Sequence, residues 1–211
     1  MENHGFVRDN IFDDIISYSI FFFIGIILGG IPTWCRFDFL QHKEGENWGN
    51  NNKNNNKDLN KNIIFFDVET NGFKGSSVLS MSAIKVNYDF EKSEWSKVSE
   101  FNRFYFREED EEMNEGAINV NGLTDEVIAF ERKKLKDKIG EYPLTFKSDM
   151  DNFFMFCQDT DHFVAHNISF DRSFVDFSLK NQFDTMKENI DILKIENNCG
   201  NYKWPKLIEC A

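Results

Sequence analysis

The sequence lacks an excess of positive charge, and it lacks the cysteine and histidine spacings that bind zinc. Its formal net charge is −12 over 211 residues, which argues against a broad basic surface that grips duplex nucleic acid. This charge does not exclude a nuclease, because a carboxylate-lined metal site is itself acidic until cations bind. The four cysteines show no CxxC spacing and form no zinc pattern with the four histidines. We therefore expect reduced, structural thiols in an intracellular domain.

Charged side chains are also absent from residues 15–35, which read "IISYSIFFFIGIILGGIPTWC". As a helix this segment would be roughly 30 Å long, enough to cross the hydrocarbon core of a bilayer. A cleaved signal peptide would need a basic start and a shorter apolar core, whereas residues 1–14 form an acidic N-terminal tail. A buried core helix is the other alternative, but the segment is apolar all round. We expect a retained transmembrane helix.

The flanks of this span predict its orientation. Lysine and arginine are more frequent after the span than before it, where Arg8 stands alone. The positive-inside rule then predicts a single-pass membrane protein whose C-terminal part is cytoplasmic. Residues 36–61 are Asn-rich and polar, so they cannot bury enough surface to offset their ordering entropy and are expected to form a flexible linker. The globular domain is expected to span residues 62–211.

Within this domain the sequence predicts a mixed α/β order, β-β-β-α-α-β-α-β. The first strand contains Ile63–Phe66, and two more are expected at Val78–Tyr88 and Trp95–Phe106. Two helices should follow, one at "TDEVIAF" (124–130) and one with Met150, Phe153, Phe154 and Cys157 on one face. The remaining elements are a strand at 162–166, a helix with Phe170, Phe174 and Phe177 on one face, and a strand from Ile190.

Two acids follow the apolar residues of the first strand in "NIIFFDVETNG". Side chains alternate along a strand, so Asp67 and Glu69 are expected on the same side, a few ångströms apart. Such a pair is favourable only when a cation or a shared proton lies between the carboxylates. A third acid, Asp171, follows the strand at 162–166, near the start of the next helix. Ligands of open α/β sheets bind at such strand ends, although a solvated helix residue is the simpler interpretation of Asp171 alone.

Several segments, in order, resemble the DEDD 3′→5′ exonucleases (DEDDh-type, DnaQ-like), whose fold is ribonuclease H-like. "FFDVETNG" resembles the first motif of this family, and "VAHNISFD" (164–171) resembles the second. "INVNGLTDEVI" (118–128) is similar to a segment that usually reads His-Gly-Ile-Thr. "DILKI" and "YKWPKLIE" are similar to the strand and helix before the third motif, so the resemblance covers roughly residues 62–211. It implies a mixed sheet with flanking helices, here preceded by one transmembrane helix.

The resemblance also implies a chemistry, which is hydrolysis of phosphodiesters at the 3′ ends of single-stranded nucleic acid with two Mg²⁺ or Mn²⁺ ions. By position, Asp67 would contact both metals, Glu69 would complete the first site and Asp171 would hold the second. Hard carboxylate oxygens suit these ions. The residues expected near the substrate are Thr70, Asn71, Gly72 and Asn167. For Thr70 and Asn167, hydrogen bonds that form turns and caps are an equal alternative.

The sequence departs from the family at the third motif, which should supply a fourth carboxylate and a histidine five residues before it. No histidine follows His166, and the tyrosine version of the motif is absent because Lys206 stands four residues after Tyr202. The last two aspartates of the sequence are Asp184 and Asp191. We expect either a C-terminally incomplete exonuclease or an inactive relative. The alternative function is a non-catalytic nucleic-acid-binding or scaffold module at the membrane.

Overall fold

The computed structural model describes residues 61–89, 92 and 94–210. The chain divides into two units, one of residues 62–86 and 98–211, the other of residues 1–61 and 87–97. In the second unit, the ring of Tyr88 lies 4.6 Å from that of Trp95. Among the residues that the structure describes, no helix is long and apolar enough to cross a membrane. The predicted N-terminal tail, the transmembrane helix at 15–35 and the linker up to residue 60 lie outside the described residues.

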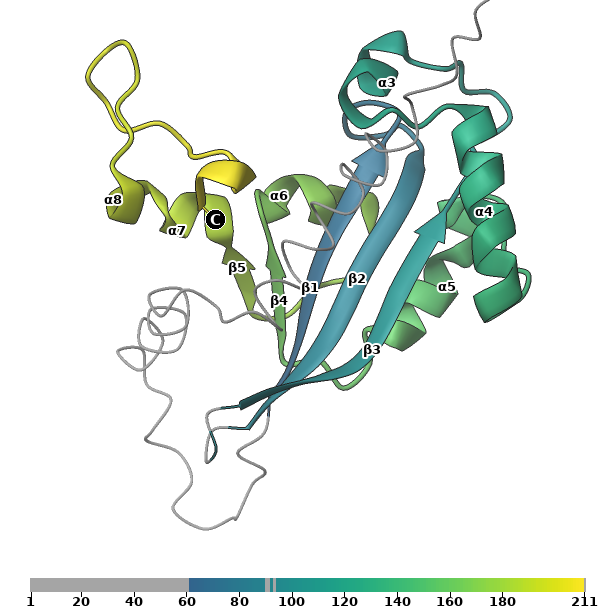
Figure 1. Ribbon diagram of the computed structural model, residues 1–211, viewed down its shortest axis with the longest axis horizontal. Coiled ribbons are helices and arrows are strands. Elements are labelled where there is room, and N and C mark those ends of the chain that lie inside the picture. The colour runs from purple at the N-terminus through teal and green to yellow at the C-terminus, as the bar shows by residue number, and fades with distance from the viewer. Residues whose placement is uncertain (1–60, 90–91, 93, 211) are drawn as a thin grey trace, which may run out of the picture. The chain divides into compact units, whose positions relative to one another are not determined.

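Five strands form one sheet in the order β3-β2-β1-β4-β5 (Figure 1). The strands are β1 (Lys61–Thr70), β2 (Val78–Asp89), β3 (Glu94–Phe104), β4 (His162–Ala165) and β5 (Gln182–Asp184). Strand β4 is parallel to both β1 and β5, with Phe65 opposite Val164 and Ala165 opposite Asp184. Parallel strands end at the same edge of a sheet, so the segments after β1, β4 and β5 are brought to one edge.

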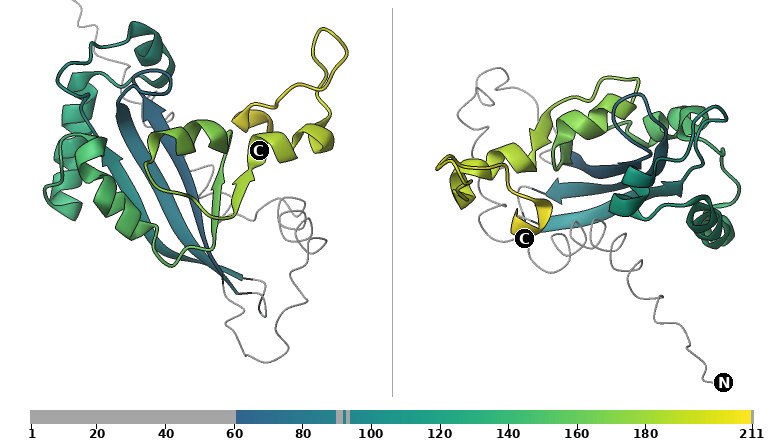
Figure 2. Two further views of the ribbon diagram at one scale, coloured as in Figure 1. Left: turned by 180° about the vertical axis from the view of Figure 1, so that it is seen from behind. Right: turned by 90° about the horizontal axis from the view of Figure 1, so that it is seen from above.

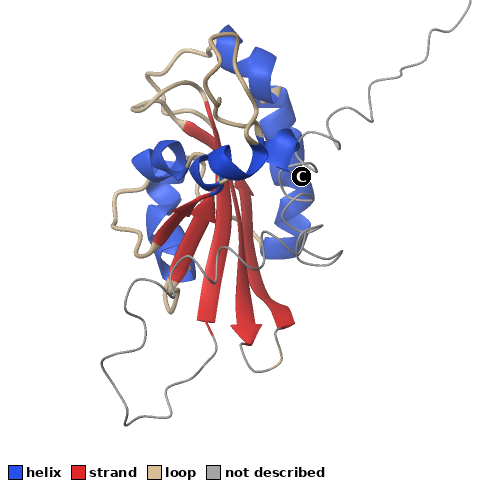
Figure 3. Cartoon of the chain, turned by 90° about the vertical axis from the view of Figure 1, so that its left-hand side faces the viewer, coloured by secondary structure: helices blue, strands red, loops and turns tan. Residues whose placement is uncertain are grey.

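The described helices lie around this sheet (Figure 3). Three of them precede β4: α3 (Glu115–Asn121), α4 (Asp125–Ile139) and α5 (Phe146–Phe156). The others are α6 (Ile168–Asp171), the 3₁₀ turn η1 (Arg172–Phe174), α7 (Thr185–Glu188), α8 (Ile190–Leu193) and the 3₁₀ turn η2 (Leu207–Cys210). Side chains of Asn114, Thr124 and Thr145 accept hydrogen bonds from the first turns of α3, α4 and α5, which explains where these helices begin.

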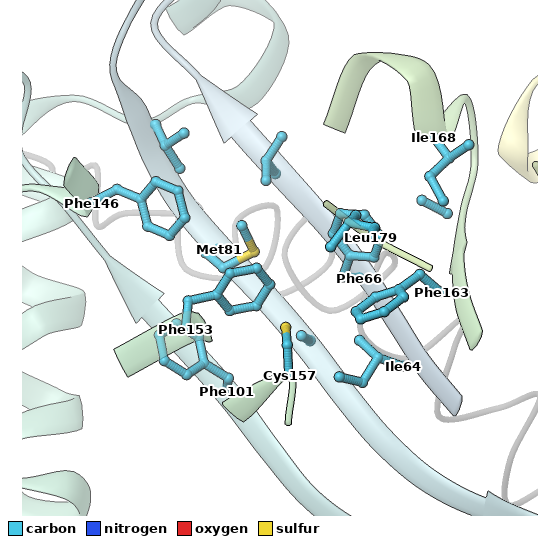
Figure 4. Packing of buried hydrophobic residues seen from close by; sticks show 14 of the residues in the cluster. Ile64, Phe66, Met81, Phe101, Phe146, Phe153, Cys157, Phe163, Ile168 and Leu179 are labelled. Atoms are coloured by element: carbon cyan, nitrogen blue, oxygen red, sulfur yellow. The ribbon is translucent and has the colours of Figure 1, made fainter. Parts of the chain in front are cut away.

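The core of the larger unit lies between one face of the sheet and the segments α5 and α6. Seen from behind, both helices cover the same face (Figure 2). Ile64 and Phe66 of β1 and Phe101 of β3 are buried there together with Phe153 of α5 and Ile168 of α6 (Figure 4). The ring centroids of Phe101 and Phe153 are 5.2 Å apart and the ring planes meet at 62°, a favourable edge-to-face geometry. This packing fixes α6 against β1.

Two of the predicted elements are wrong. The strand predicted from Ile190 is helix α8, and the edge strand is instead β5. A short apolar run does not distinguish a strand from a helix by periodicity alone. The helix predicted through Phe170, Phe174 and Phe177 ends sooner, because Val175 has an extended backbone after η1. The helix α3 was not predicted, whereas β1 runs through Asp67 and Glu69 to Thr70, as the expected alternation of the two acids along the strand requires.

Candidate active site

The structure brings Asp67, Glu69 and Asp171 together. Asp67 and Glu69 are partly buried on β1, with the buried Val68 between them. Asp171 is the last residue of α6 and only 2% exposed. Its Oδ1 accepts a hydrogen bond of 3.1 Å from the backbone N–H of Val68, 103 residues earlier in the chain. The segment that carries Asp171 therefore lies directly against the strand that carries Asp67 and Glu69.

Burial is the main cause of a raised pKa in all three acids, and neighbouring charge adds to it in Glu69 and Asp171. Burial raises the pKa of Asp67 to about 6. Burial and the charge of Asp67 raise the pKa of Glu69 to about 7, against the opposing effect of a hydrogen bond from Asn121. Burial, followed by the charge of Asp67, raises the pKa of Asp171 well above its usual range. Three acids in this environment cannot all be ionised near neutral pH unless a cation compensates them.

The chemistry of this donor set fits a hard divalent cation, because all three side chains offer carboxylate oxygens. The positions of the side chains fit less well. Within the described part of the chain, no group of three or more His, Cys, Asp or Glu side chains could hold a metal ion as arranged. One oxygen of Asp171 is already engaged by Val68. Coordination by Asp67, Glu69 and Asp171 therefore stays a prediction, and it requires at least one of these side chains to rotate.

The turn after β1 is held by its own hydrogen bonds. The hydroxyl of Thr70 donates to the carbonyl oxygen of Gly72 at 2.6 Å. The Asn71 side chain is 3% exposed and donates to Glu111 Oε1 at 2.6 Å and to the carbonyl of Glu112 at 2.8 Å. Its Oδ1 accepts from the N–H of Asn114 at 3.0 Å. Thr70 and Asn71 thus shape the turn, and the predicted contact of residues 70–72 with a substrate stays a prediction.

Asn167 occupies the turn between β4 and α6. It has a left-handed backbone with φ 65° and ψ 50°, and its side chain makes no capping hydrogen bond. Its N–H donates to Asp184 Oδ1 at 3.0 Å. Asparagine tolerates this conformation better than most residues, which explains its presence here. Substrate contact by its side chain remains a prediction.

A cavity of about 820 Å³ opens beside the turn that follows β1. Its wall combines the segment after β1, the segment 106–114, the first turn of α5 and the η1 segment. The carboxylates of Asp67, Glu69 and Asp171 do not line it, but Asn71 and Ser173 do, each two residues beyond an acid. The apolar and cationic side chains of the wall are Phe73, Phe106, Phe146, Phe174, Val78, Met150, Lys74 and Lys147.

Asn121 is one residue at this site that sequence reasoning missed. Its side chain is buried, hydrogen-bonds Glu69 and donates to the carbonyl of Thr70 at 3.0 Å. Asn121 lies within "INVNGLTDEVI", the segment similar to the family's His-Gly-Ile-Thr, so the available signal was its place in that motif. It orients Glu69 from the end of α3.

His166 is not free to act as a base. Its Nδ1 lies 3.2 Å from Thr185 Oγ1, and its Nε2 lies 3.1 Å from the carbonyl oxygen of Pro205. Burial lowers the pKa of His166, while the Pro205 carbonyl and the charge of Asp184 act in the opposite direction. The neighbours on both ring nitrogens indicate a role in packing the C-terminal segment.

No family model and no curated protein matches this chain. Solved structures do match. Exonuclease X in complex with 5′ overhanging duplex DNA is 17% identical with a TM-score of 0.44, over 64% of this chain and 66% of that one. Product-bound exonuclease I is 16% identical with a TM-score of 0.47, over 69% and 36%. E. coli exonuclease I with a dA16 oligonucleotide is 15% identical with a TM-score of 0.46, over 69% and 34%.

This chain therefore spans about a third of the exonuclease I chains that it matches. Its own five strands form a mixed sheet with flanking helices. At these identities and TM-scores the similarity does not establish a family or an activity, so functional conclusions depend on the site itself.

Proposed function

We propose that this chain is a 3′→5′ exonuclease-like hydrolase of the DEDD type, which removes nucleotides from 3′ ends of nucleic acid by two-metal-ion phosphodiester hydrolysis. The observation that supports this most is the proximity of three buried or partly buried acids, in which the charge of Asp67 adds to burial in raising the pKa of Glu69 and Asp171. Structural ion pairs normally place a cationic side chain beside buried acids. Here the charged neighbours of the acids are other acids, which is typical of a metal or catalytic site.

In this proposal each residue has a defined task. Bound Mg²⁺ or Mn²⁺ would supply charge stabilisation for the attacking and leaving oxygens. Asp67, Glu69 and Asp171 would provide the carboxylate oxygens that hold these ions. Asn121 fixes the side chain of Glu69, and the N–H of Val68 fixes that of Asp171. The sequence supplies no histidine of a third motif to take the proton from water, so we expect impaired turnover.

The cavity beside Gly72 is the proposed site of the terminal nucleotide. Phe73 is 88% exposed and offers a face on which a base can stack. Lys74 and Lys147 provide positive charge for a phosphate, whereas Glu108, Asp110, Glu111 and Glu112 make the rest of the lining acidic. A single-stranded end fits this mixed charge better than a duplex, whose two backbones require a broad basic surface.

A second function is favoured by one structural observation. Because no metal-holding group of three acids, histidines or cysteines is present among the described residues, the chain could retain the fold without turnover. It would then be a non-catalytic nucleic-acid-binding or scaffold module. In both cases we propose membrane anchoring through residues 15–35, with the exonuclease-like domain in the cytoplasm, on the grounds of the uncharged segment and its flanking charges.

Metal binding and the direction in which an oligonucleotide is degraded distinguish the two proposed functions. We expect Mn²⁺ to raise the melting temperature of the purified 211-residue chain, and Asp67→Ala to remove that shift. Asp137→Ala is the matched control, because Asp137 is an exposed acid on α4. A 5′-labelled oligonucleotide should yield a ladder of slowly shortened products, whereas a 3′-labelled one should release labelled mononucleotide first. A chain with no Mn²⁺ response and no products would be the non-catalytic module.

A further inference from the structure

Asp184 is the last residue of β5 and is 7% exposed. Its Oδ1 accepts hydrogen bonds from the N–H groups of Met186 at 3.1 Å and Lys187 at 3.4 Å, which caps α7. The same oxygen accepts a third and shorter hydrogen bond, 3.0 Å, from the N–H of Asn167. Capping explains the first two contacts. The third reaches outside the helix, to the turn between β4 and α6.

That turn determines where Asp171 lies. Asn167 has a positive φ of 65°, a conformation that asparagine tolerates better than most residues but that contacts with its surroundings still stabilise. Immediately after it comes α6, which has only four residues and ends at Asp171. A helix this short has no stability of its own, so its direction depends on the packing of Ile168 in the core and on contacts at its ends. At its start, the backbone contact is the hydrogen bond from Asn167 to Asp184.

A second contact joins the same two segments. Lys187 Nζ lies 3.5 Å from Asp184 Oδ2 and donates to Ser169 Oγ at 3.4 Å. Ser169 belongs to α6, and Lys187 belongs to α7. One oxygen of the Asp184 carboxylate thus contacts the turn directly. The other oxygen lies next to Lys187, which contacts α6. Both contacts connect the end of β5 to the segment that carries Asp171.

We propose that Asp184 is a positioning residue for Asp171, acting through the backbone of Asn167. It holds the left-handed turn so that α6 presents the Asp171 carboxylate to Val68 and to the acids of β1. The importance of this position for metal binding rests on the proposed function. The positioning itself is a statement about geometry and can be measured without metal.

Three substitutions separate positioning from capping. Asp184→Asn keeps an oxygen acceptor of the same reach, so it should keep both contacts. Asp184→Ser still caps α7, since serine is a preferred N-cap, but its shorter side chain cannot also reach Asn167. Asp184→Ala loses both contacts. Asp161→Ala is the matched control. Asp161 lies immediately before β4, at the end of that strand opposite to Asn167, and its Oδ2 accepts a 3.1 Å hydrogen bond from the N–H of Asn62.

The first measurement is hydrogen exchange of the Val68 amide, which reports its hydrogen bond to Asp171, in the purified 211-residue chain without metal. The rate of the Val68 amide is expressed relative to that of the Ile64 amide in the same strand. We expect this relative rate to be about tenfold higher in Asp184→Ser and Asp184→Ala than in the unsubstituted chain. Asp184→Asn and Asp161→Ala should leave the Val68 rate relative to Ile64 unchanged. If Asp184→Ser exchanges like the unsubstituted chain, Asp184 only caps α7 and the proposal is overturned.

The second measurement is Mn²⁺ affinity by titration calorimetry on the same proteins. Loss of a residue that orients a metal ligand typically weakens binding by about tenfold or more, so Asp184→Ser should do so and Asp184→Asn should not. Adding Asn167→Gly to Asp184→Ser should restore part of the affinity, because glycine adopts the left-handed turn without support. If the unsubstituted chain binds no Mn²⁺, the proposed function fails, while the Val68 exchange still decides the role of Asp184.

Discussion

The backbone N–H of Val68 donates a 3.1 Å hydrogen bond to the Asp171 carboxylate, and this contact joins segments 103 residues apart. Val68 stands between Asp67 and Glu69 on β1, so the bond places the third acid beside the first two. It also stabilises the ionised form of Asp171, in opposition to burial and to the neighbouring charges, which favour the protonated form. The free chain therefore holds a cluster of acids in which protonation and cation binding compete.

The first prediction concerns the pH dependence of stability without metal. The pKa of Asp67 rises from 3.8 to about 6 and that of Glu69 from 4.5 to about 7 on folding, so the folded chain binds protons more tightly than the unfolded chain. The resulting stability is fully present below about pH 4 and is lost as the pH rises through 6 to 7. We expect the double variant Asp67→Asn/Glu69→Gln to melt at least ~3 °C above the unsubstituted chain at pH 8 in EDTA.

The same pair of proteins should melt at similar temperatures near pH 4.5, where both acids are protonated in the folded chain. Calorimetric scans from pH 4.5 to 8.5 test this. Equal melting temperatures at pH 8 would show that the two carboxylates are not destabilised by their surroundings.

The second prediction concerns the turn after β1. The Asn71→Ala substitution removes three side-chain hydrogen bonds, to Glu111, Glu112 and Asn114. It removes the partners of the Glu112 carbonyl and the Asn114 N–H and empties a buried position, so the free energy of unfolding should fall by about 2 kcal/mol in urea titrations. The control is Asn119→Ala, which changes an exposed asparagine on α3 and should cost less than about 0.5 kcal/mol. If both variants cost the same, the contacts of Asn71 do not hold the turn.

Glu111 should be coupled to Asn71 in these measurements. Its Oε1 accepts from Asn71, and its Oε2 accepts from Ser77 N at 2.8 Å and from the Ser77 hydroxyl. A double-mutant cycle of Asn71→Ala and Glu111→Ala should therefore show a coupling of about 1 kcal/mol.

Local sequence patterns predicted the parts of the fold that have strong periodicity. The apolar run Ile63–Phe66 predicted β1, and the alternation along it placed Asp67 and Glu69 on one side. The strand β5 was missed because it has three residues and carries no periodic signal. The segment from Ile190 was misassigned because four apolar-rich residues fit a helix or a strand equally.

Only part of the candidate site could be predicted from the sequence. The proximity of Asp171 to Val68 depends on the parallel pairing of β1 with β4, which no local pattern encodes; the resemblance to a family was needed to connect the two segments. Asn121 and Asp184 were missed as site residues for a related reason. Each acts by hydrogen-bonding a segment distant in sequence, and neither residue type suggests a partner.

The third prediction concerns the N-terminal segment. Because residues 15–35 carry no charge, the 211-residue chain should remain in the membrane fraction after washing with alkaline carbonate. Protease added to sealed vesicles should cut residues 36–61 only when it has access to the cytoplasmic face. Introducing two lysines, at Phe22 and Ile26, should release the chain into the soluble fraction. Recovery of the unsubstituted chain in the soluble fraction would exclude the anchor.

The last prediction concerns catalysis, and it follows from how His166 is held. Both of its ring nitrogens lie next to oxygen atoms, of Thr185 and Pro205, and no histidine follows it in the sequence. Without a general base, proton removal from the attacking water loses a contribution of ~10² to 10⁴ in rate. The 211-residue chain should therefore degrade a single-stranded oligonucleotide at least ~10³-fold more slowly than a DEDD exonuclease with a complete third motif.

Single-turnover assays with excess protein and Mn²⁺ measure this residual rate. His166→Gln should leave it within about twofold, since the ring serves packing and not proton transfer, whereas Asp67→Asn should abolish it. A residual rate that His166→Gln removes, with the protein still folded, would identify His166 as the base after all. Ordinary exonuclease rates would contradict the prediction more broadly, and would mean that Asp184 or Asp191 replaces the fourth carboxylate. Asp184 is the less suitable of the two, because its Oδ1 is already occupied by three backbone N–H groups.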